Sequence, residues 1–198
     1  MKQPIENIAV IGTGVIGAGW IIRFLFNQKT ICVYDPQLKQ KKFLDNEIKR
    51  AKPILKKIYK KNINLSKQLK FCKSIKEAVK NADLIQENAP ENEILKIKIV
   101  KEISKYAKKN TIIASSSSGL LPSKIQSQCL NPKRLIIAHP FNPVYLLPLV
   151  ELVPGKKTDK RFINKADKFY SNIGMKTLIL KKELPGYLSD RLQESMWR

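Results

Sequence analysis

The stretch from Ile8 to Asp35 constrains the fold of this chain more than any other, because it combines two apolar strands with a glycine-rich turn and a helix. The apolar run 8–11 is typical of a strand that is buried on both faces of a parallel sheet. The turn after it has the spacing G-x-G-x-x-G, and a helix is expected to begin near Val15. A second apolar strand, 30–34, ends at Asp35. The stretch predicts the first βαβ unit of an α/β fold with a Rossmann-like, doubly wound, mainly parallel sheet.

The glycine turn predicts a dinucleotide site because each of its glycines has a physical role. Gly12 makes the tight turn, Gly14 lets the backbone approach a pyrophosphate, and Gly17 lets the helix pack on the strand. Three glycines can also form an ordinary turn. However, the combination of two strands, a helix and an acidic residue after the second strand favours a nucleotide-binding site. Asp35, roughly 20 residues further on, can accept hydrogen bonds from the adenosine ribose and would repel the 2′-phosphate of NADP. We therefore expect NAD as the cofactor.

Composition describes one globular domain with part of a second. The chain is strongly basic, with 38 Lys+Arg against 16 Asp+Glu and a formal net charge of +22, which leaves nucleic-acid binding open as an alternative. However, the lysines are spread along predicted helix faces, as at 39–61 and 96–109, and do not alternate with aromatic residues on one stripe. We expect no nucleic-acid partner and interpret the charge as a solvated surface with some attraction for anionic ligands.

Cysteine usage and the lack of long apolar segments indicate the compartment. The chain has three cysteines, Cys32, Cys72 and Cys129, at unrelated spacings. An odd number without a regular spacing is typical of small core residues under reducing conditions. No segment approaches the ~18 uninterrupted apolar residues of a membrane span, and the start MKQPIEN lacks the apolar centre of a signal peptide. We expect a cytoplasmic protein with no membrane partner and no metal site.

The rest of the chain alternates short apolar strands with helical segments, as expected for right-handed crossovers in a parallel sheet. A lysine-rich segment at 37–61 has apolar residues at helical spacing, and Pro53 should kink that helix or split it in two. The other predicted elements are strands at 69–72, 83–86, 111–114, 134–138, 147–153 and 176–180, helices at 75–81, 92–108 and 120–130, and a last helix from Pro185 and Gly186.

Two residues in the second half of the chain predict acid–base chemistry. His139, the only histidine, follows a predicted strand and so lies at the edge of the sheet where open α/β sheets bind ligands. Imidazole has an unperturbed pKa of about 6.5, which suits proton transfer near neutral pH. Glu151 interrupts an apolar strand and needs a partner if it is buried. We expect His139 to be that partner, with a structural histidine and a lysine salt bridge to Glu151 as the alternatives.

Other polar residues follow strands at the same edge. The four serines 115–118 would place hydroxyls where nicotinamide and substrate meet, although an ordinary polar loop fits them as well. Glu91 and Lys96 open the predicted helix at 92–108. Taken alone, neither indicates a function, because an acid in a first helical turn commonly compensates the helix dipole.

A series of motifs resembles the 3-hydroxyacyl-CoA dehydrogenase family, in order and at matching spacing over essentially the whole chain. The motifs are the glycine turn, PEN at 90–92, ASSSSGL at 114–120, HPFNP at 139–143, LVELV at 149–153 and PGYLSDRL at 185–192. The resemblance implies an NAD-dependent oxidoreductase that oxidises a secondary 3-hydroxyl to a ketone. His139 would be the base, Glu151 would orient it, and Ser118 would bind the substrate oxygen. The resemblance also implies that the following residues contact the cofactor: Gly12, Thr13, Gly14, Val15, Ile16, Gly17, Asp35, Glu91, Lys96, Ser118 and Asn142.

Within the family, the motifs at 115–124 and 139–153 are most similar to the branch that oxidises L-carnitine to 3-dehydrocarnitine. Where the acyl-CoA branch has an asparagine in the motif PGF-x-x-N-R, this chain has Asp190. An anion near the reacting carbon would suit a trimethylammonium substrate. Phe141, Tyr145 and Trp197 could add cation–π contacts or could simply pack. A 3-hydroxyacyl-CoA substrate and a non-catalytic NAD-binding module remain the alternatives.

The resemblance also implies a domain division. Residues 1–183 would form the NAD-binding domain, and 184–198 would be the first helix of an incomplete C-terminal helical domain. Family members continue with helices that cover the active site and form the dimer, so we expect a homodimer in the full-length form. Without those helices, an exposed apolar patch is expected at Leu188, Leu192, Met196 and Trp197.

Overall fold

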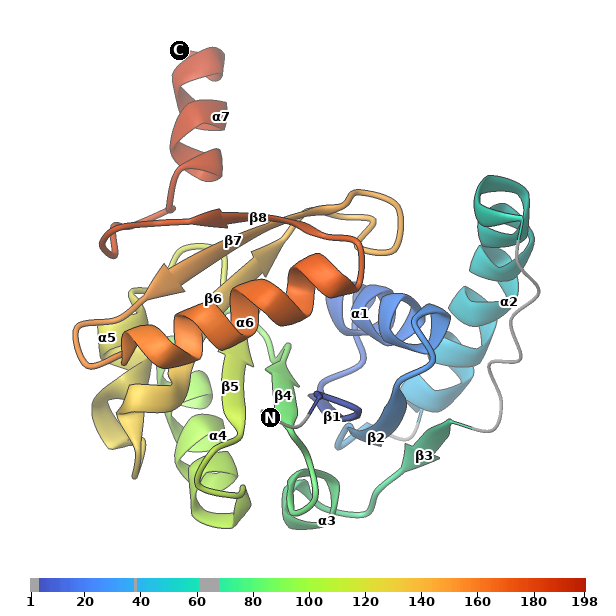
Figure 1. The fold of residues 1–198 in the computed structure, drawn as a ribbon, viewed down its shortest axis with the longest axis horizontal. Coiled ribbons are helices and arrows are strands. Elements are labelled where there is room, and N and C mark those ends of the chain that lie inside the picture. The colour runs from blue at the N-terminus through green and yellow to red at the C-terminus, as the bar shows by residue number, and fades with distance from the viewer. Residues whose placement is uncertain (1–3, 38, 61–67) are drawn as a thin grey trace.

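The computed structural model describes residues 4–37, 39–60 and 68–198, which form an eight-stranded sheet with helices on both faces (Figure 1). The strands are β1 (Asn7–Ile11), β2 (Thr30–Tyr34), β3 (Leu69–Phe71), β4 (Leu84–Glu87), β5 (Ile112–Ser115), β6 (Leu135–Pro140), β7 (Leu149–Pro154) and β8 (Lys176–Ile179). Their order is β3-β2-β1-β4-β5-β6-β7-β8. Strands β1 to β6 are parallel, whereas β7 pairs antiparallel with β6 and β8 pairs parallel with β7. The predicted doubly wound, mainly parallel α/β sheet is confirmed.

Helices cover both faces of the sheet. They are α1 (Val15–Phe26), α2 (Lys39–Tyr59), α3 (Ile75–Val79), α4 (Glu93–Tyr106), α5 (Pro122–Ile125), α6 (Lys160–Asn172) and α7 (Ser189–Trp197), with 3-10 turns η1 (Gln126–Gln128) and η2 (Pro132–Arg134). Residues of α1, α2 and α6 pack on one face around Trp20, whose ring stacks on Phe24 at 5.3 Å. Residues of α3, α4 and α5 pack on the other face. Strands β1, β4, β5, β6 and β7 are therefore largely buried on both sides, which explains their apolar runs, whereas the edge strands β3 and β8 contain no buried residue.

The long helix around Pro53 is unbroken, so the expectation that proline could split it is wrong. Leu44 and Ala51 are buried before the proline and Leu55 is buried after it. Because both halves are held by packing, the helix tolerates the hydrogen bond that proline removes. The outer parts of the prediction, at 38 and 61, lie outside the described residues.

Two predicted helices are shorter than expected. The segment 120–130 forms only α5 and η1. The last helix begins at Ser189, after Pro185 and Gly186, because Gly186 and Tyr187 have φ angles of 68° and 46°. Positive φ angles do not occur within a right-handed α-helix, so these two residues form a turn ahead of α7.

Helix α6 lies in a segment for which the sequence patterns above give no prediction. Its first turn is capped by Asp159, whose side chain accepts a hydrogen bond from the backbone N–H of Arg161 at 2.9 Å. Its buried residues recur at helical spacing: Phe162, Ile163, Ala166, Phe169 and Tyr170. This amphipathic pattern was the available signal for α6.

Helix α7 projects from the body of the molecule (Figure 1), and none of its residues is buried. The predicted apolar patch is confirmed, with exposed fractions of 46–79% at Leu188, Leu192, Met196 and Trp197.

The three cysteines are free thiols, two of them buried. Within the described residues, no helix is both long and apolar enough to cross a membrane.

Candidate active site

A cavity of about 730 Å³ lies at the carboxyl ends of β1, β2 and β4, beside the glycine turn. Strand order reverses between β1 and β4, and open α/β sheets bind ligands at such a switch point. The turn contributes Gly12, Gly14, Val15 and Ile16 to its lining. The other predicted site residues that line it are Asp35, Glu91, Ser118 and His139. The structure thus brings together residues that are more than 100 positions apart in the chain.

The three glycines of the turn differ in what surrounds them. A Cβ on Gly17 would lie 2.1 Å from the carbonyl oxygen of Gly12, and a Cβ on Gly12 would lie 2.8 Å from the carbonyl oxygen of Asn88. These two glycines are required by close backbone packing. A Cβ on Gly14 would meet no atom within 4 Å, so this position leaves open space beside the start of α1. That space fits the phosphates of a dinucleotide at a helix N-terminus.

Asp35 is fixed at the end of β2. Its Oδ2 accepts hydrogen bonds from the backbone N–H of Thr13 at 2.8 Å and from the Thr13 hydroxyl at 2.9 Å. Its Oδ1 accepts from the backbone N–H of Gln37 at 2.9 Å. Thr13 is buried under the turn and does not line the cavity, so its observed contact is with Asp35. The carboxylate is therefore held where a ribose would approach.

His139 and Glu151 form a hydrogen-bonded pair, and the expected pairing is confirmed. Nδ1 of His139 lies 2.8 Å from Oε2 of Glu151, and the two residues are directly opposite in the antiparallel β6–β7 ladder. The imidazole is 12% exposed and the carboxylate is fully buried. The alternative of a lysine partner is wrong, because the other donors to Glu151 are Leu188 and Ser189. Burial alone would raise the pKa of Glu151, but these hydrogen bonds hold it below its ordinary value.

Two aromatic rings flank the imidazole. The ring of Phe141 lies 5.7 Å from that of His139, and the ring of Tyr187 lies 5.5 Å from it. Tyr187 is fully buried and donates its hydroxyl to the carbonyl of Leu120 at 2.8 Å. Sequence patterns gave no role to Tyr187. Its contact depends on the turn ahead of α7, which the sequence patterns did not predict.

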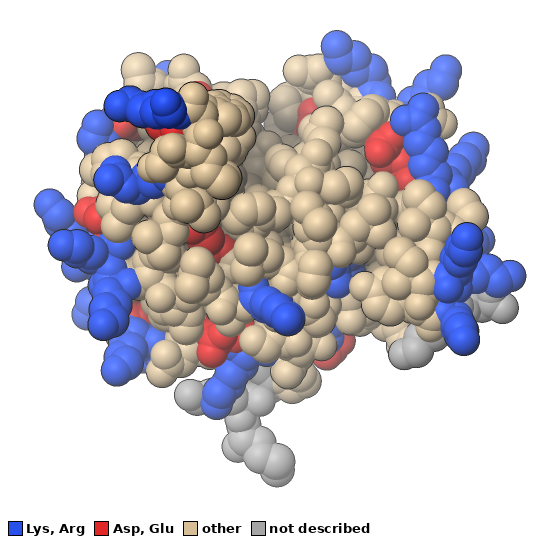
Figure 2. All heavy atoms as spheres, turned by 90° about the horizontal axis from the view of Figure 1, so that it is seen from above, with Lys and Arg blue, Asp and Glu red and all other residues tan. Residues whose placement is uncertain are grey.

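Carboxylates concentrate around Tyr187 even though the chain is basic overall. Burial raises the pKa of its phenol, the Ser117 hydroxyl opposes the change, and the charges of Glu91, Glu151 and Asp190 raise it further. Of these three carboxylates, Glu91 lines the cavity, and Nζ of Lys96 lies 3.6 Å from its carboxylate. Figure 2 shows many Lys and Arg side chains around the rim of the face viewed from above, as the basic composition predicts.

The four serines at and after the end of β5 differ in their surroundings. Ser115 donates its hydroxyl to Glu87 at 2.5 Å, Ser116 to Asn88 at 2.8 Å, and Ser117 to Glu91. These three hydroxyls fix the loops at the edge of the sheet. Ser116 and Ser118 both line the cavity, as does His139. The substrate contact of Ser118 stays a prediction.

Glu91 joins the loop after β4 to the loop after β5. Its Oε1 accepts the backbone N–H groups of Ser118 and Gly119 at 3.1 Å each and that of Leu120 at 3.4 Å. Burial would raise the pKa of Glu91, but the Ser117 hydroxyl, these backbone donors and the charge of Lys96 hold it below its ordinary value. The carboxylate is thus ionised while it organises the cavity wall.

A buried ion pair between Lys96 and Glu87 supports this wall. Nζ of Lys96 lies 3.1 Å from both carboxylate oxygens of Glu87, and both side chains are almost completely buried. It also donates to the carbonyl of Ala89 at 2.9 Å and lies 3.6 Å from Glu91. Lys96 therefore sits behind the cavity wall and does not line the cavity. Glu87 had no predicted role, although it ends an apolar strand and the argument used for Glu151 would have found it.

Three further predicted site residues lie outside the cavity lining. Gly17 is buried under the turn, Asn142 is exposed after β6, and Asp190 is half-buried in the first turn of α7. None of these three lines the cavity.

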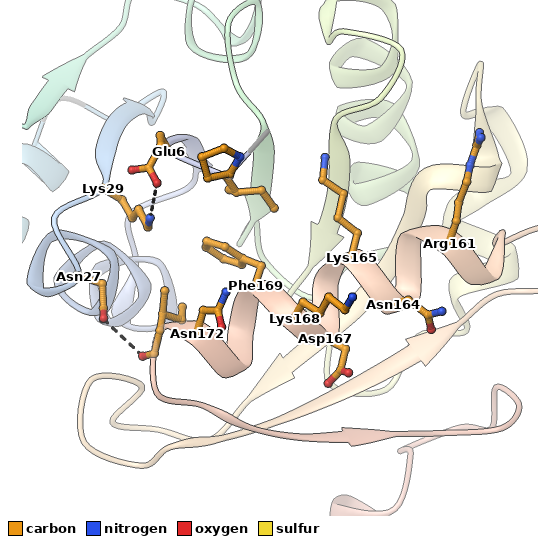
Figure 3. Close-up of a pocket in the computed structure, with 13 residues that line it drawn as sticks. Glu6, Asn27, Lys29, Arg161, Asn164, Lys165, Asp167, Lys168, Phe169 and Asn172 are labelled. Carbon is orange, nitrogen blue, oxygen red and sulfur yellow. Dashed lines mark hydrogen bonds and ion pairs between the residues drawn. The ribbon is translucent and has the colours of Figure 1, made fainter. Parts of the chain in front are cut away.

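A separate cavity of about 550 Å³ lies between α6 and the chain segments that enter β1 and β2 (Figure 3). An ion pair from Lys29 to Glu6 at 2.9 Å forms part of its wall, and none of the predicted site residues lines it.

A glycine turn and a histidine that line one cavity, the histidine paired with a buried carboxylate, are features expected of an NAD-dependent dehydrogenase. Residues 7–184 match the family described as 3-hydroxyacyl-CoA dehydrogenase, NAD binding domain, and the chain belongs to this family. NAD is accordingly its cofactor, and the family comprises NAD-dependent 3-hydroxy dehydrogenases.

Named relatives agree with this assignment. The chain is 46% identical over 193 residues to L-carnitine dehydrogenase of Oceanobacillus iheyensis, covering 98% of this chain and 63% of the relative. It is 45% identical over 197 residues to L-carnitine dehydrogenase of Bacillus cereus, covering 100% and 60%. A crystal structure of 5-formyl-3-hydroxy-2-methylpyridine 4-carboxylic acid 5-dehydrogenase, an NAD+-dependent dismutase, superposes with a TM-score of 0.90 at 27% identity, covering 98% and 63%. The chain thus spans about 60% of the length of its curated relatives.

Proposed function

We propose that this chain is the cofactor-binding and proton-transferring part of an enzyme that oxidises the secondary hydroxyl of L-carnitine to a ketone. The observation that carries the proposal is the His139–Glu151 pair, whose imidazole lines the same cavity as Gly12 and Gly14. Bound NAD supplies the hydride acceptor. The residues of the chain supply binding, orientation and proton transfer.

Proton transfer is assigned to His139. Its Nδ1 is occupied by Glu151, so Nε2 is the nitrogen that accepts the proton of the substrate hydroxyl. The buried carboxylate stabilises the imidazolium that forms and keeps the ring in one tautomer. Ser118 donates a hydrogen bond to the substrate oxygen as the proton leaves. In the reverse direction the same groups return the proton to the ketone oxygen.

The choice of L-carnitine is supported by charge and by similarity. The charges of Glu91, Glu151 and Asp190 all act on Tyr187, whose ring lies 5.5 Å from the imidazole, and carboxylates attract a trimethylammonium group. The curated relatives at 45–46% identity are named L-carnitine dehydrogenase. A 3-hydroxyacyl-CoA thioester is the second candidate, because the family is named for that substrate.

Other proposals concern the whole protein. We propose that residues 184–198 begin a second, helical domain, that the full-length protein is a homodimer, and that it is cytoplasmic. The exposed apolar patch at the start and along the face of α7 supports further packing there.

The substrate class is tested by following NADH formation by the purified chain with L-carnitine and, in parallel, with 3-hydroxybutyryl-CoA. Turnover with L-carnitine alone is the expected result. Turnover with the thioester alone would contradict the substrate assignment. If neither substrate reacts while NAD raises the melting temperature, the chain is a cofactor-binding module and the catalytic proposal fails for it.

A further inference from the structure

We infer that Ser189, the first residue of α7, is a positioning residue that sets how readily His139 takes up a proton. The inference deepens the proposed function and rests on it for its catalytic meaning. Through Ser189, helix α7 would influence the chemistry of the His139–Glu151 pair, which lies on two strands of the sheet. Nothing in the similarity to known relatives assigns Ser189 a role.

Glu151 receives four hydrogen bonds, and three of them come from the start of α7. Its Oε2 accepts the Ser189 hydroxyl at 2.6 Å and faces Nδ1 of His139 at 2.8 Å. Its Oε1 accepts the backbone N–H groups of Leu188 and Ser189 at 3.1 Å each. The carboxylate therefore bridges the imidazole on one side and the helix N-terminus on the other.

These bonds and the turn at Tyr187 attach the start of α7 to the sheet. The nine residues of the helix contribute no buried side chain. The ring of Tyr187 packs beside His139, and its hydroxyl is bonded to Leu120. A helix that lacks packing of its own is thus held at the catalytic pair, with the positive end of its dipole at Glu151.

The shared oxygen gives the Ser189 hydroxyl an electrostatic effect on His139. Both groups donate to Oε2, so the serine withdraws negative charge that would otherwise stabilise the imidazolium. Removing the hydroxyl leaves Glu151 a stronger partner for a protonated ring. The imidazole of the Ser189→Ala variant should therefore hold its proton to higher pH.

His139 is the only histidine in the chain, which makes this effect directly measurable. In a chain without a histidine tag, the Cε1–H proton of this imidazole gives a single NMR signal that can be titrated with no substrate present. We compare the natural chain with Ser189→Ala and with Ser189→Thr, which retains a hydroxyl. Ser195→Ala is the matched control, because Ser195 lies on the exposed part of α7 and its hydroxyl donates to the carbonyl of Arg191 at 2.9 Å.

The expected result is a titration midpoint about half a pH unit higher in Ser189→Ala, with the threonine variant and the control close to the natural chain. A midpoint at or below that of the natural chain would overturn the inference, since a merely structural serine lowers the melting temperature without raising the midpoint. If the alanine variant does not fold, Ser189→Cys, with a weaker donor of similar size, must shift the same way.

The NMR result separates this inference from the proposed function. If the midpoint shifts while no substrate turns over, the positioning role of Ser189 stands and the catalytic proposal fails. If the chain oxidises L-carnitine and the midpoint does not move, the catalytic proposal stands and this inference fails. In an active chain, the acid limb of the pH–rate profile should shift with the midpoint.

Discussion

The site depends on single residues whose neighbours determine their chemistry. His139 and Glu151 could be predicted because each is out of place in its sequence context, one as the only histidine and the other as an acid in an apolar strand. Lys96 was assigned to the cofactor by resemblance, whereas the structure pairs it with buried Glu87. Ser189 could not be predicted, because its contact with Glu151 spans 38 residues and depends on the turn before α7.

Replacing Glu151 with glutamine tests the electrostatic part of the pair. The amide keeps the size of the side chain but has no charge to stabilise the imidazolium. We expect the rate constant for oxidation to fall by about 10²–10⁴-fold, with NAD binding retained. Steady-state kinetics and NAD titration measure the two effects. Glu194→Gln, on an exposed pair with Arg198, is the control and should leave both unchanged. Equal rates in the natural chain and in Glu151→Gln would rule out this role.

At the scale of elements, the unit from β1 to β2 was predictable because its strands, turn and helix each have a local pattern. The reversed direction of β7 was not, since an apolar strand has the same pattern in either direction. That direction matters for the site, because it places Glu151 opposite His139. Helix α6 has a clear amphipathic pattern and was missed, while Pro53 suggested a break that packing prevents.

The glycine turn gives a prediction in which two alanine substitutions separate folding from binding. Gly17→Ala places a Cβ against the backbone of Gly12, so we expect a loss of about 1–3 kcal/mol in the free energy of unfolding. Gly14→Ala meets no protein atom, so its stability should change by less than about 0.5 kcal/mol. The added methyl group occupies the space assigned to phosphate, and NAD affinity should fall about tenfold or more.

Thermal unfolding and NAD titration of both variants measure these effects. Gly119→Ala serves as a control, because a Cβ there also meets no atom within 4 Å and the residue lies outside the turn. Unchanged NAD affinity in Gly14→Ala would place the phosphates elsewhere.

At the scale of the whole molecule, the chain combines a basic surface with a site in which the pKa values of two carboxylates are lowered. Glu91 and Glu151 both have pKa values below their ordinary range because hydrogen-bond donors outweigh burial. A carboxylate with a lowered pKa in the folded state stabilises the fold above the pKa of the unfolded chain, about 4.3 for Glu. That stabilisation is lost as the pH falls through the lower, folded value.

The chain should therefore lose stability as the pH falls below about 4.5, in addition to any effect of its net charge. Melting temperatures of the natural chain and of Glu91→Gln across this range test the point. The variant removes one of the linked carboxylates, so its melting temperature should fall less steeply with acid. Parallel curves for the two proteins would show that Glu91 is not linked to folding.

The measurement that tests the central claim most directly is the initial rate of NADH formation from L-carnitine by the natural chain and by His139→Gln, after NAD binding has been verified for both. The account predicts that the natural chain turns over and that the variant binds NAD but is slower by about 10²–10⁴-fold. A variant that oxidises L-carnitine at the natural rate would contradict the assignment of His139 as the base. Absence of turnover in the natural chain with NAD bound would contradict the claim that this chain performs the oxidation.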